Sequence, residues 1–141
     1  MSLPIVRFFL ISTGIVYLGL GLSFIFATST MVSKLPFMIT APAGTTEIRA
    51  VYGGLELALG IVFIYAGALN RSLDFAVFTM LATFIGLATI RGVGILIDGS
   101  QDSFTMKLWY VESFGVLYSS LSWVLLKLNE PGSSLSFLGG E

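Results

Sequence analysis

Four charged side chains lie within long apolar runs of this sequence, where an ionisable group is costly and marks either function or a specific partner. They are Arg49, Glu56, Arg91 and Glu112. Two guanidinium groups and two carboxylates could bind an anionic head group, hold a proton or cation, or pair with one another. Tyr52 lies one helical turn from Arg49 and adds a phenolic hydroxyl. These five residues are the candidate ligand-binding residues.

The composition limits the chemistry that these residues can perform. The chain contains no cysteine and no histidine, which excludes disulfides, zinc-finger sites, iron–sulfur clusters, thiol nucleophiles and Ser-His-Asp triads. Carboxylate, guanidinium, ammonium, phenol and hydroxyl groups remain for polar chemistry. We predict no metal site and no cofactor, and we assign no residue as catalytic. The formal net charge of -1 excludes a strongly basic surface for nucleic acid, so we expect no nucleic-acid partner.

Four apolar runs must position the charged residues. The 141-residue chain is 55% hydrophobic and 11% charged, less than half of the roughly 25% charged residues of soluble domains. Each run approaches or exceeds the roughly 20 residues that a membrane helix needs. The predicted spans cover about residues 4–27, 47–69, 75–97 and 107–128. We predict an all-α integral-membrane four-helix bundle, formed by one domain over residues 1–141 with an irregular C-terminal tail at 129–141.

The charged residues are predicted to lie at similar depths. A helix rises about 1.5 Å per residue, which places Glu56 roughly 13 Å, Arg91 roughly 10 Å and Glu112 roughly 8 Å below the face that carries the two longer connections. Arg49 lies just above them. We therefore expect two acids and two bases to meet in one layer, with Arg91 in contact with Glu56 or Glu112.

Glycine accompanies these charges along predicted helical stripes, and small residues allow neighbouring helices to approach closely. The charged stripes are Arg49-Tyr52-Gly53-Glu56-Gly60, Arg91-Gly94-Asp98 and Trp109-Glu112-Gly115-Ser119. A further stripe in the first run consists of Gly14, Tyr17, Gly21 and Phe24.

Three interpretations of the charged layer remain open. The charges could form an internal clamp that fixes helix packing. They could instead line a pocket that opens toward the longer connections, with an arginine for an anionic head group or a carboxylate for a proton or cation. They could also face a partner subunit. Tyr52 and Trp109 fit the aromatic belt at a membrane interface as well as a ligand-stacking role.

The stretch EIRAVYGGLELALG resembles a family of small bacterial four-span membrane proteins catalogued as domain of unknown function 4345. The residues that carry the likeness are Glu47, Arg49, Ala50, Tyr52, Gly53, Gly54, Leu57 and Gly60, followed by Arg91, Gly94, Asp98 and Glu112. The likeness covers roughly residues 5–128. The resemblance implies a four-span fold and the same polar positions, and it brings no substrate, cofactor or reaction.

Three classes of function fit these features. We favour a non-enzymatic ligand-binding or accessory subunit with a charged intramembrane layer near one face. The alternatives are a proton- or ion-coupled transporter that uses Glu56, and an intramembrane lipid-modifying enzyme that uses Glu56 and Glu112 as an acid–base pair. The expected partners are the lipid bilayer, a lipid-like or anionic small molecule, and a larger membrane complex or a homo-oligomer.

The distribution of basic residues gives an orientation. Arg7, Arg71 and Lys127 lie on the side of the termini, whereas Lys34 and Lys107 lie on the opposite side. If Arg49 and Arg91, which lie further in, are paired inside the bundle, the positive-inside rule favours both termini in the cytoplasm. The resemblance to a bacterial family implies that the membrane is a bacterial inner membrane.

Overall fold

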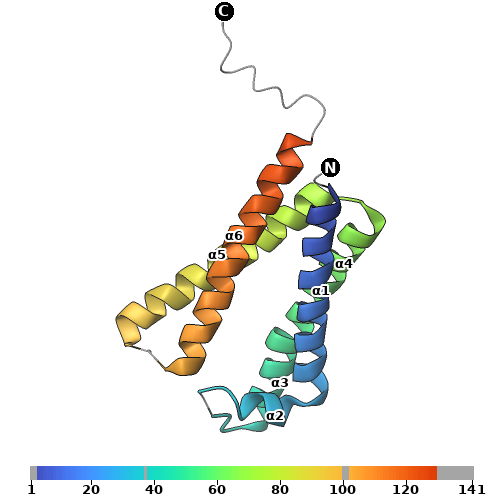
Figure 1. Ribbon diagram of the computed structural model, residues 1–141. Helices are drawn as coiled ribbons and strands as arrows, with labels where there is room; N and C mark the ends of the chain where they lie inside the picture. Colours follow the sequence, from blue (N-terminus) through green and yellow to red (C-terminus); the bar gives the residue numbers. More distant parts are fainter. Residues whose placement is uncertain (1–2, 37, 100–101, 130–141) are drawn as a thin grey trace, which may run out of the picture. The chain divides into compact units, whose positions relative to one another are not determined.

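The structure, a computed structural model, describes residues 3–36, 38–99 and 102–129, and these residues are predominantly helical (Figure 1). The elements in order are α1 (Leu3–Phe26), α2 (Thr28–Val32), α3 (Pro42–Ile48), the π-helical η1 (Arg49–Gly54), α4 (Leu55–Leu69), α5 (Leu73–Asp98) and α6 (Ser103–Leu128). The segments α3, η1 and α4 follow one another without a break and form one long helical run. The predicted all-α class with four long helices is therefore confirmed.

Three of the long helical runs have the length and hydropathy of membrane spans, which indicates an integral membrane protein. They are Leu3–Phe26, Pro42–Leu69 and Leu73–Asp98. α6 is long enough at 26 residues, but it is less apolar because it carries Lys107, Glu112 and several serines. Its role as the fourth span remains a prediction.

The second long run begins earlier than the sequence predicts. It starts at Pro42 rather than near Glu47, because proline is well suited to the first helical position, where its missing N–H would have no partner. Ala41 precedes the helix without a side-chain cap. Of the predicted irregular tail, residues 130–141 lie outside the described part of the chain.

The chain divides into two compact units. One contains residues 10–71, and the other contains residues 1–9 with residues 72–141. In the turn between α4 and α5, Asn70 and Ser72 both adopt left-handed backbone conformations, each with φ of 52°. Asn70 is the C-cap residue of α4, and asparagine tolerates the left-handed conformation that often ends a helix.

Close packing of α1 against the second helical run holds the unit of residues 10–71 together. A Cβ atom added to Gly21 would lie 2.9 Å from the carbonyl oxygen of Gly53, and one added to Gly14 would lie 2.9 Å from that of Gly60. The two helices are therefore antiparallel, with glycine at two contact points seven residues apart along each. The rings of Tyr17 and Phe63 pack edge to face between them, with centroids 5.8 Å apart. The predicted glycine stripe of α1 is confirmed as a helix-packing surface.

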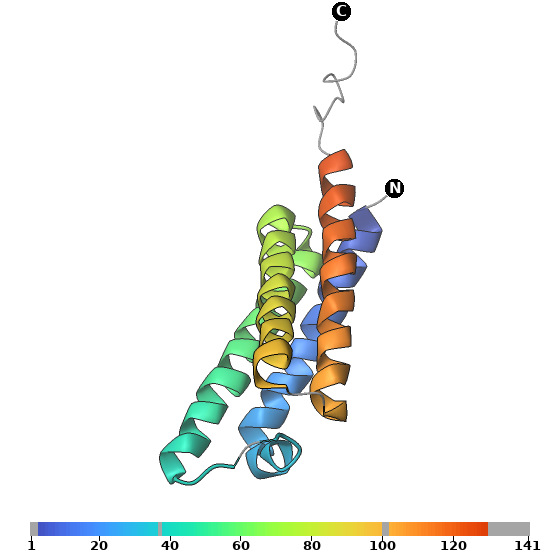
Figure 2. The same cartoon turned by 90° about the vertical axis from the view of Figure 1, so that its left-hand side faces the viewer.

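The antiparallel pair of α5 and α6 forms the core of the other unit (Figure 2). At one end the indole Nε1 of Trp109 donates a hydrogen bond to the backbone oxygen of Ala88 at 3.1 Å. Toward the other end, Lys127 Nζ lies 3.5 Å from Asp74 Oδ1. Between these points Gly115 leaves room for the ring of Phe84.

Asp102 defines the start of α6. Its Oδ1 accepts hydrogen bonds from the backbone N–H groups of Phe104 and Thr105, both at 3.0 Å. The Thr105 hydroxyl donates to Oδ2 at 2.5 Å, and this side-chain bond is the main reason why the pKa of Asp102 lies below its usual value. The residue satisfies two of the N–H groups that have no partner within the helix.

Candidate functional site

Arg91 on α5 and Glu112 on α6 form a bidentate ion pair. The Nε of Arg91 donates to Oε2 of Glu112 and Nη2 donates to Oε1, both at 2.7 Å. The side chain of Glu112 is 8% exposed and that of Arg91 is 29% exposed. This geometry is the strong form of a charge-assisted hydrogen bond, and it neutralises both groups. The predicted contact of Arg91 with one of the two acids is confirmed for Glu112.

The pair forms because the antiparallel register of the two helices brings the glycine-bearing stripe of α6 against α5. Glu112 and Gly115 are buried, and Ser119 and Ser122 continue the same buried stripe with hydroxyl groups that donate to carbonyls of their own helix. Such back-bonding satisfies the serines within α6. Glu112 is thus the charged member of the stripe, and Arg91 on α5 supplies its partner.

The surface of α5 is hollowed beside Arg91. An open depression of about 500 Å³ is lined by small and apolar residues together with Arg91, namely Ala82, Thr83, Gly86, Leu87, Ile90 and Arg91. The guanidinium of Arg91 is already bound by Glu112. The depression therefore offers a ligand an apolar surface, and its charged residue, Arg91, is already paired with Glu112.

Arg49 belongs to a separate cluster in the unit of residues 10–71. Its Nε donates to Oγ1 of Thr28 at 2.8 Å, and the same hydroxyl donates to the backbone oxygen of Phe24 at 2.7 Å. The ring of Tyr52 packs against that of Phe24 with centroids 5.3 Å apart. Arg49 is exposed, and within the described residues its guanidinium has no acidic partner. The terminal nitrogens of Arg49 are therefore available to an external acceptor.

The π-helical segment η1 joins this cluster to Glu56. Its sequence is RAVYGG, and the N–H of Leu55 bonds to the carbonyl of Ala50, five residues back. The sequence predicts an uninterrupted helical span over residues 47–69 and does not predict this segment. The adjacent Gly53 and Gly54 are the available signal, because glycine relaxes the backbone and weakens a regular helix. Short π-helical segments are frequent at functional sites.

Glu56 lies in the first turn of α4, near the middle of the Pro42–Leu69 run. Its Oε2 atom is buried and accepts no hydrogen bond from any described residue. Among the buried side-chain nitrogen and oxygen atoms of the described residues, it is the one without a partner. An unpaired acceptor in such surroundings carries a desolvation penalty of about 1–3 kcal/mol, and more if it is charged, so its presence calls for an explanation.

The structure thus sorts the five candidate residues into two sets. Arg91 and Glu112 pair between α5 and α6, whereas Arg49, Tyr52 and Glu56 lie along one helical run. The meeting of all the charges in a single layer stays a prediction.

The chain belongs to the family described as Domain of unknown function (DUF4345), whose model matches residues 5–124. This confirms the resemblance seen in the sequence. No curated protein matches the chain, and no solved structure matches it. The family has no assigned activity, so its function must be argued from the geometry of the site.

Proposed function

We propose that this member of the DUF4345 family is a non-enzymatic membrane protein that binds an amphipathic ligand, or a segment of a partner subunit, along the Arg49–Glu56 part of its second span. The observation that carries this proposal is the buried Oε2 atom of Glu56, which lacks a hydrogen-bond donor near the middle of an apolar span. Retaining such a group costs stability unless another molecule satisfies it.

Arg49 and Tyr52 support the same assignment. Arg49 is exposed and presents guanidinium N–H groups without an acidic partner among the described residues, and Tyr52 is 40% exposed with its ring held by Phe24. Together with Glu56 they present donors, an aromatic surface and an acceptor along one helical run. A molecule with an apolar tail can use all three if its polar head carries an acceptor for Arg49 as well as a donor for Glu56.

Arg91 and Glu112 serve a different purpose in this proposal. Both carboxylate oxygens of Glu112 accept hydrogen bonds from Arg91, so the pair holds α5 against α6. The same bonds weigh against an acid–base reaction by Glu56 and Glu112, because Glu112 has no free oxygen with which to exchange a proton. Proton-coupled transport through Glu56 is the second candidate, since an unpaired carboxylate within a span could also take up a proton.

We further propose that the protein lies in a bacterial inner membrane with its termini in the cytoplasm. The support for the orientation is a small excess of basic groups at the predicted terminal side, where Arg7, Arg71, Lys127 and the amino terminus lie, over Lys34, Arg49 and Lys107 at the opposite side.

Native mass spectrometry of the protein extracted in its own lipids tests the proposed function. Wild-type protein should retain a bound amphipathic molecule or a partner subunit. Glu56→Gln and Arg49→Gln should each lose it. Glu47→Gln should keep it, because Glu47 is an exposed acid in α3, within the same helical run, and serves as the matched control.

Two results would contradict the proposal. Folded Glu56→Gln and Arg49→Gln variants that retain every molecule bound by the wild type would show that the residues are structural. Proton flux into liposomes that requires Glu56 and occurs without any bound ligand would assign the protein to transport instead.

A further inference from the structure

We infer that the group presented to Glu56 is a positively charged hydrogen-bond donor, an organic ammonium carried on an apolar tail. This inference rests on the proposed function and adds the chemical class of the ligand. The sequence predicts an anionic ligand on the basis of binding by the arginines. The structure instead points to Glu56 as the residue that needs a ligand, and a carboxylate calls for a cation.

The hydrogen-bonding state of the charged residues selects the ligand. Arg91 is neutralised by Glu112, and Arg49 is held by Thr28 and forms no ion pair with Glu56. Within the described part of the second span, no cation therefore compensates Glu56. A ligand that brings only acceptors would leave Oε2 of Glu56 unpaired, and an anion would also be repelled by a carboxylate in an apolar environment.

An ammonium group satisfies both the charge and the hydrogen bond. Each N–H donates to a carboxylate oxygen in a short, charge-assisted bond, and the resulting pair is neutral in the apolar surroundings. A quaternary ammonium would supply the charge without a donor, whereas an alcohol would supply a donor without the charge. The two requirements can therefore be separated by changing the head group alone.

The neighbours of Glu56 fit an amine with an apolar tail. Tyr52, four residues earlier, is 40% exposed, and the face of a tyrosine ring attracts a cation. Leu55 is 56% exposed and provides apolar surface at the adjacent position. Gly53 and Gly60 are buried against α1, so the part of the helix around Glu56 that is open to a ligand is the part that carries Tyr52 and Leu55.

The test compares four amphiphiles that share a dodecyl tail and differ in the head group. Dodecylammonium, dodecyltrimethylammonium, dodecanol and dodecyl sulfate are titrated into the purified full-length protein in a neutral maltoside detergent. Because partition of the tail is common to all four, differences in affinity report on the head group. Dodecylammonium should bind roughly 10- to 100-fold more tightly than the others, the range that a charged hydrogen bond supplies.

Variants locate the binding at Glu56. Glu56→Gln should lose this preference for dodecylammonium, and Glu47→Gln should keep it. A labelling experiment on wild-type protein covers the case in which Glu56→Gln does not fold. Dicyclohexylcarbodiimide reacts with carboxyl groups in apolar surroundings, and peptide mapping should show that dodecylammonium slows the labelling of Glu56 whereas dodecyl sulfate does not.

The outcomes separate this inference from the proposed function. Tighter binding of dodecyl sulfate, with a loss of that binding in Arg49→Gln, would overturn the ammonium assignment and leave a ligand-binding protein. Equal binding of all four amphiphiles to wild type and Glu56→Gln, with labelling unaffected by any of them, would overturn both.

Discussion

At the scale of single residues, two glutamates within the helices differ in whether their carboxylate oxygens are paired. Glu112 has both carboxylate oxygens bound by Arg91, whereas Glu56 has a buried oxygen without a donor in the described structure. The difference arises from the neighbouring helix, which supplies an arginine at the right register for Glu112. A paired charge in a membrane protein stabilises packing, and an unpaired one is a candidate for function.

Replacing Arg91 should therefore be costly for stability. Arg91→Ala leaves the buried carboxylate of Glu112 without its partner, and we expect a loss of roughly 3 kcal/mol, the lower end for an orphaned buried charge because Arg91 is 29% exposed. The free energy of unfolding can be measured in mixed micelles by titration with a denaturing detergent. Arg71→Ala is the control, because Arg71 is exposed in the turn before α5 and should change stability by less than about 0.5 kcal/mol.

The double variant Arg91→Ala with Glu112→Gln tests whether the residues act as a pair. Removing the charge of Glu112 relieves the penalty left by Arg91→Ala, so the double variant should be more stable than the sum of the single effects predicts. Simple additivity would show that the bonds at 2.7 Å contribute no coupling energy.

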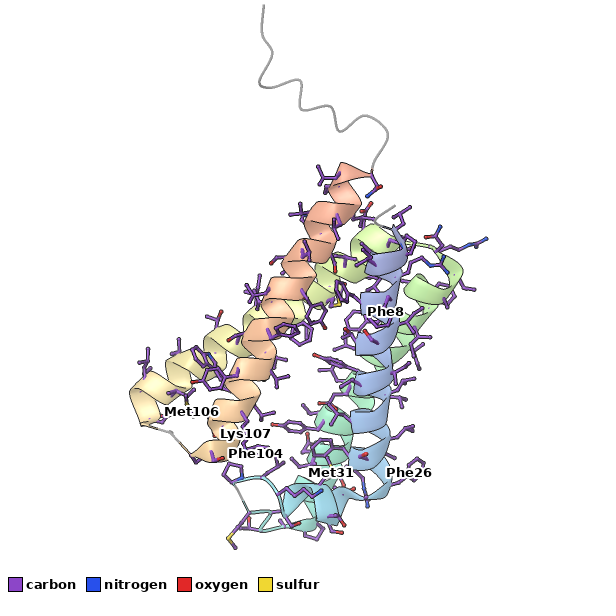
Figure 3. The ribbon with its side chains drawn as sticks, in the orientation of Figure 1. Phe8, Phe26, Met31, Phe104, Met106 and Lys107 are labelled. Carbon is purple, nitrogen blue, oxygen red and sulfur yellow. The ribbon has the colours of Figure 1, made fainter. Side chains whose placement is uncertain are left out.

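At the scale of helices, glycine decides how closely two elements approach. Gly14 and Gly21 on α1 lie against Gly60 and Gly53, so that backbone meets backbone where other helices would place side chains. In a membrane the hydrophobic effect does not drive helices together, and dispersion contacts between close backbones take its place. The end of α1 carries exposed apolar surface, since Phe26, its last residue, is 82% exposed and projects from the ribbon (Figure 3).

A pair of glycine substitutions on α1 tests this packing. A Cβ atom at Gly21 would lie 2.7 Å from the backbone nitrogen of Leu57, so Gly21→Ala must push the helices apart and should destabilise by about 1–3 kcal/mol. A Cβ atom at Gly19 meets nothing within 4 Å, and Gly19→Ala should be neutral or stabilise the helix by up to about 1 kcal/mol. The same unfolding titration measures both variants, and equal effects would argue against close packing at Gly21.

At the scale of the whole molecule, the membrane topology depends on α6. Three helical runs have the hydropathy of spans, and α6 is as long as α5 but less apolar. Its polar residues are largely accommodated internally, because Glu112 is paired and Ser119, Ser120 and Ser122 donate to carbonyls of the same helix. These bonds lower the cost of placing α6 within the bilayer.

Single cysteines can establish the topology directly, because the chain contains none of its own. With four spans, cysteines at Ser72 and Asn129 should react with an impermeant thiol reagent from the same side of the membrane. Cysteines at Ser29 and Ser103 should react from the opposite side. If Ser103→Cys and Asn129→Cys label from the same side, α6 does not cross the membrane.

Several features of this protein follow from the sequence alone. Long apolar runs predict helices because a membrane-embedded backbone must satisfy its own hydrogen bonds, and the predicted spans agree with the observed helices to within a few residues for α1, α5 and α6. Spacing of three to four residues predicts the packing stripe of α1. The cost of an isolated charge predicts that Arg91 contacts an acid, although it leaves Glu56 and Glu112 as equal choices.

The tertiary structure decided which charged residues pair, because helical periodicity and depth in the membrane do not determine this. Depth along a helix is a one-dimensional quantity, whereas an ion pair also requires the rotation of each helix about its axis and the register between neighbours. The antiparallel register of α5 and α6 selected Glu112 as the partner of Arg91. The π-helical turn at Arg49–Gly54 likewise depends on the backbone around two glycines and changes the helical phase before Glu56. The unpaired oxygen of Glu56 can be recognised only when the positions of the surrounding donors are known, and the sequence does not give these positions.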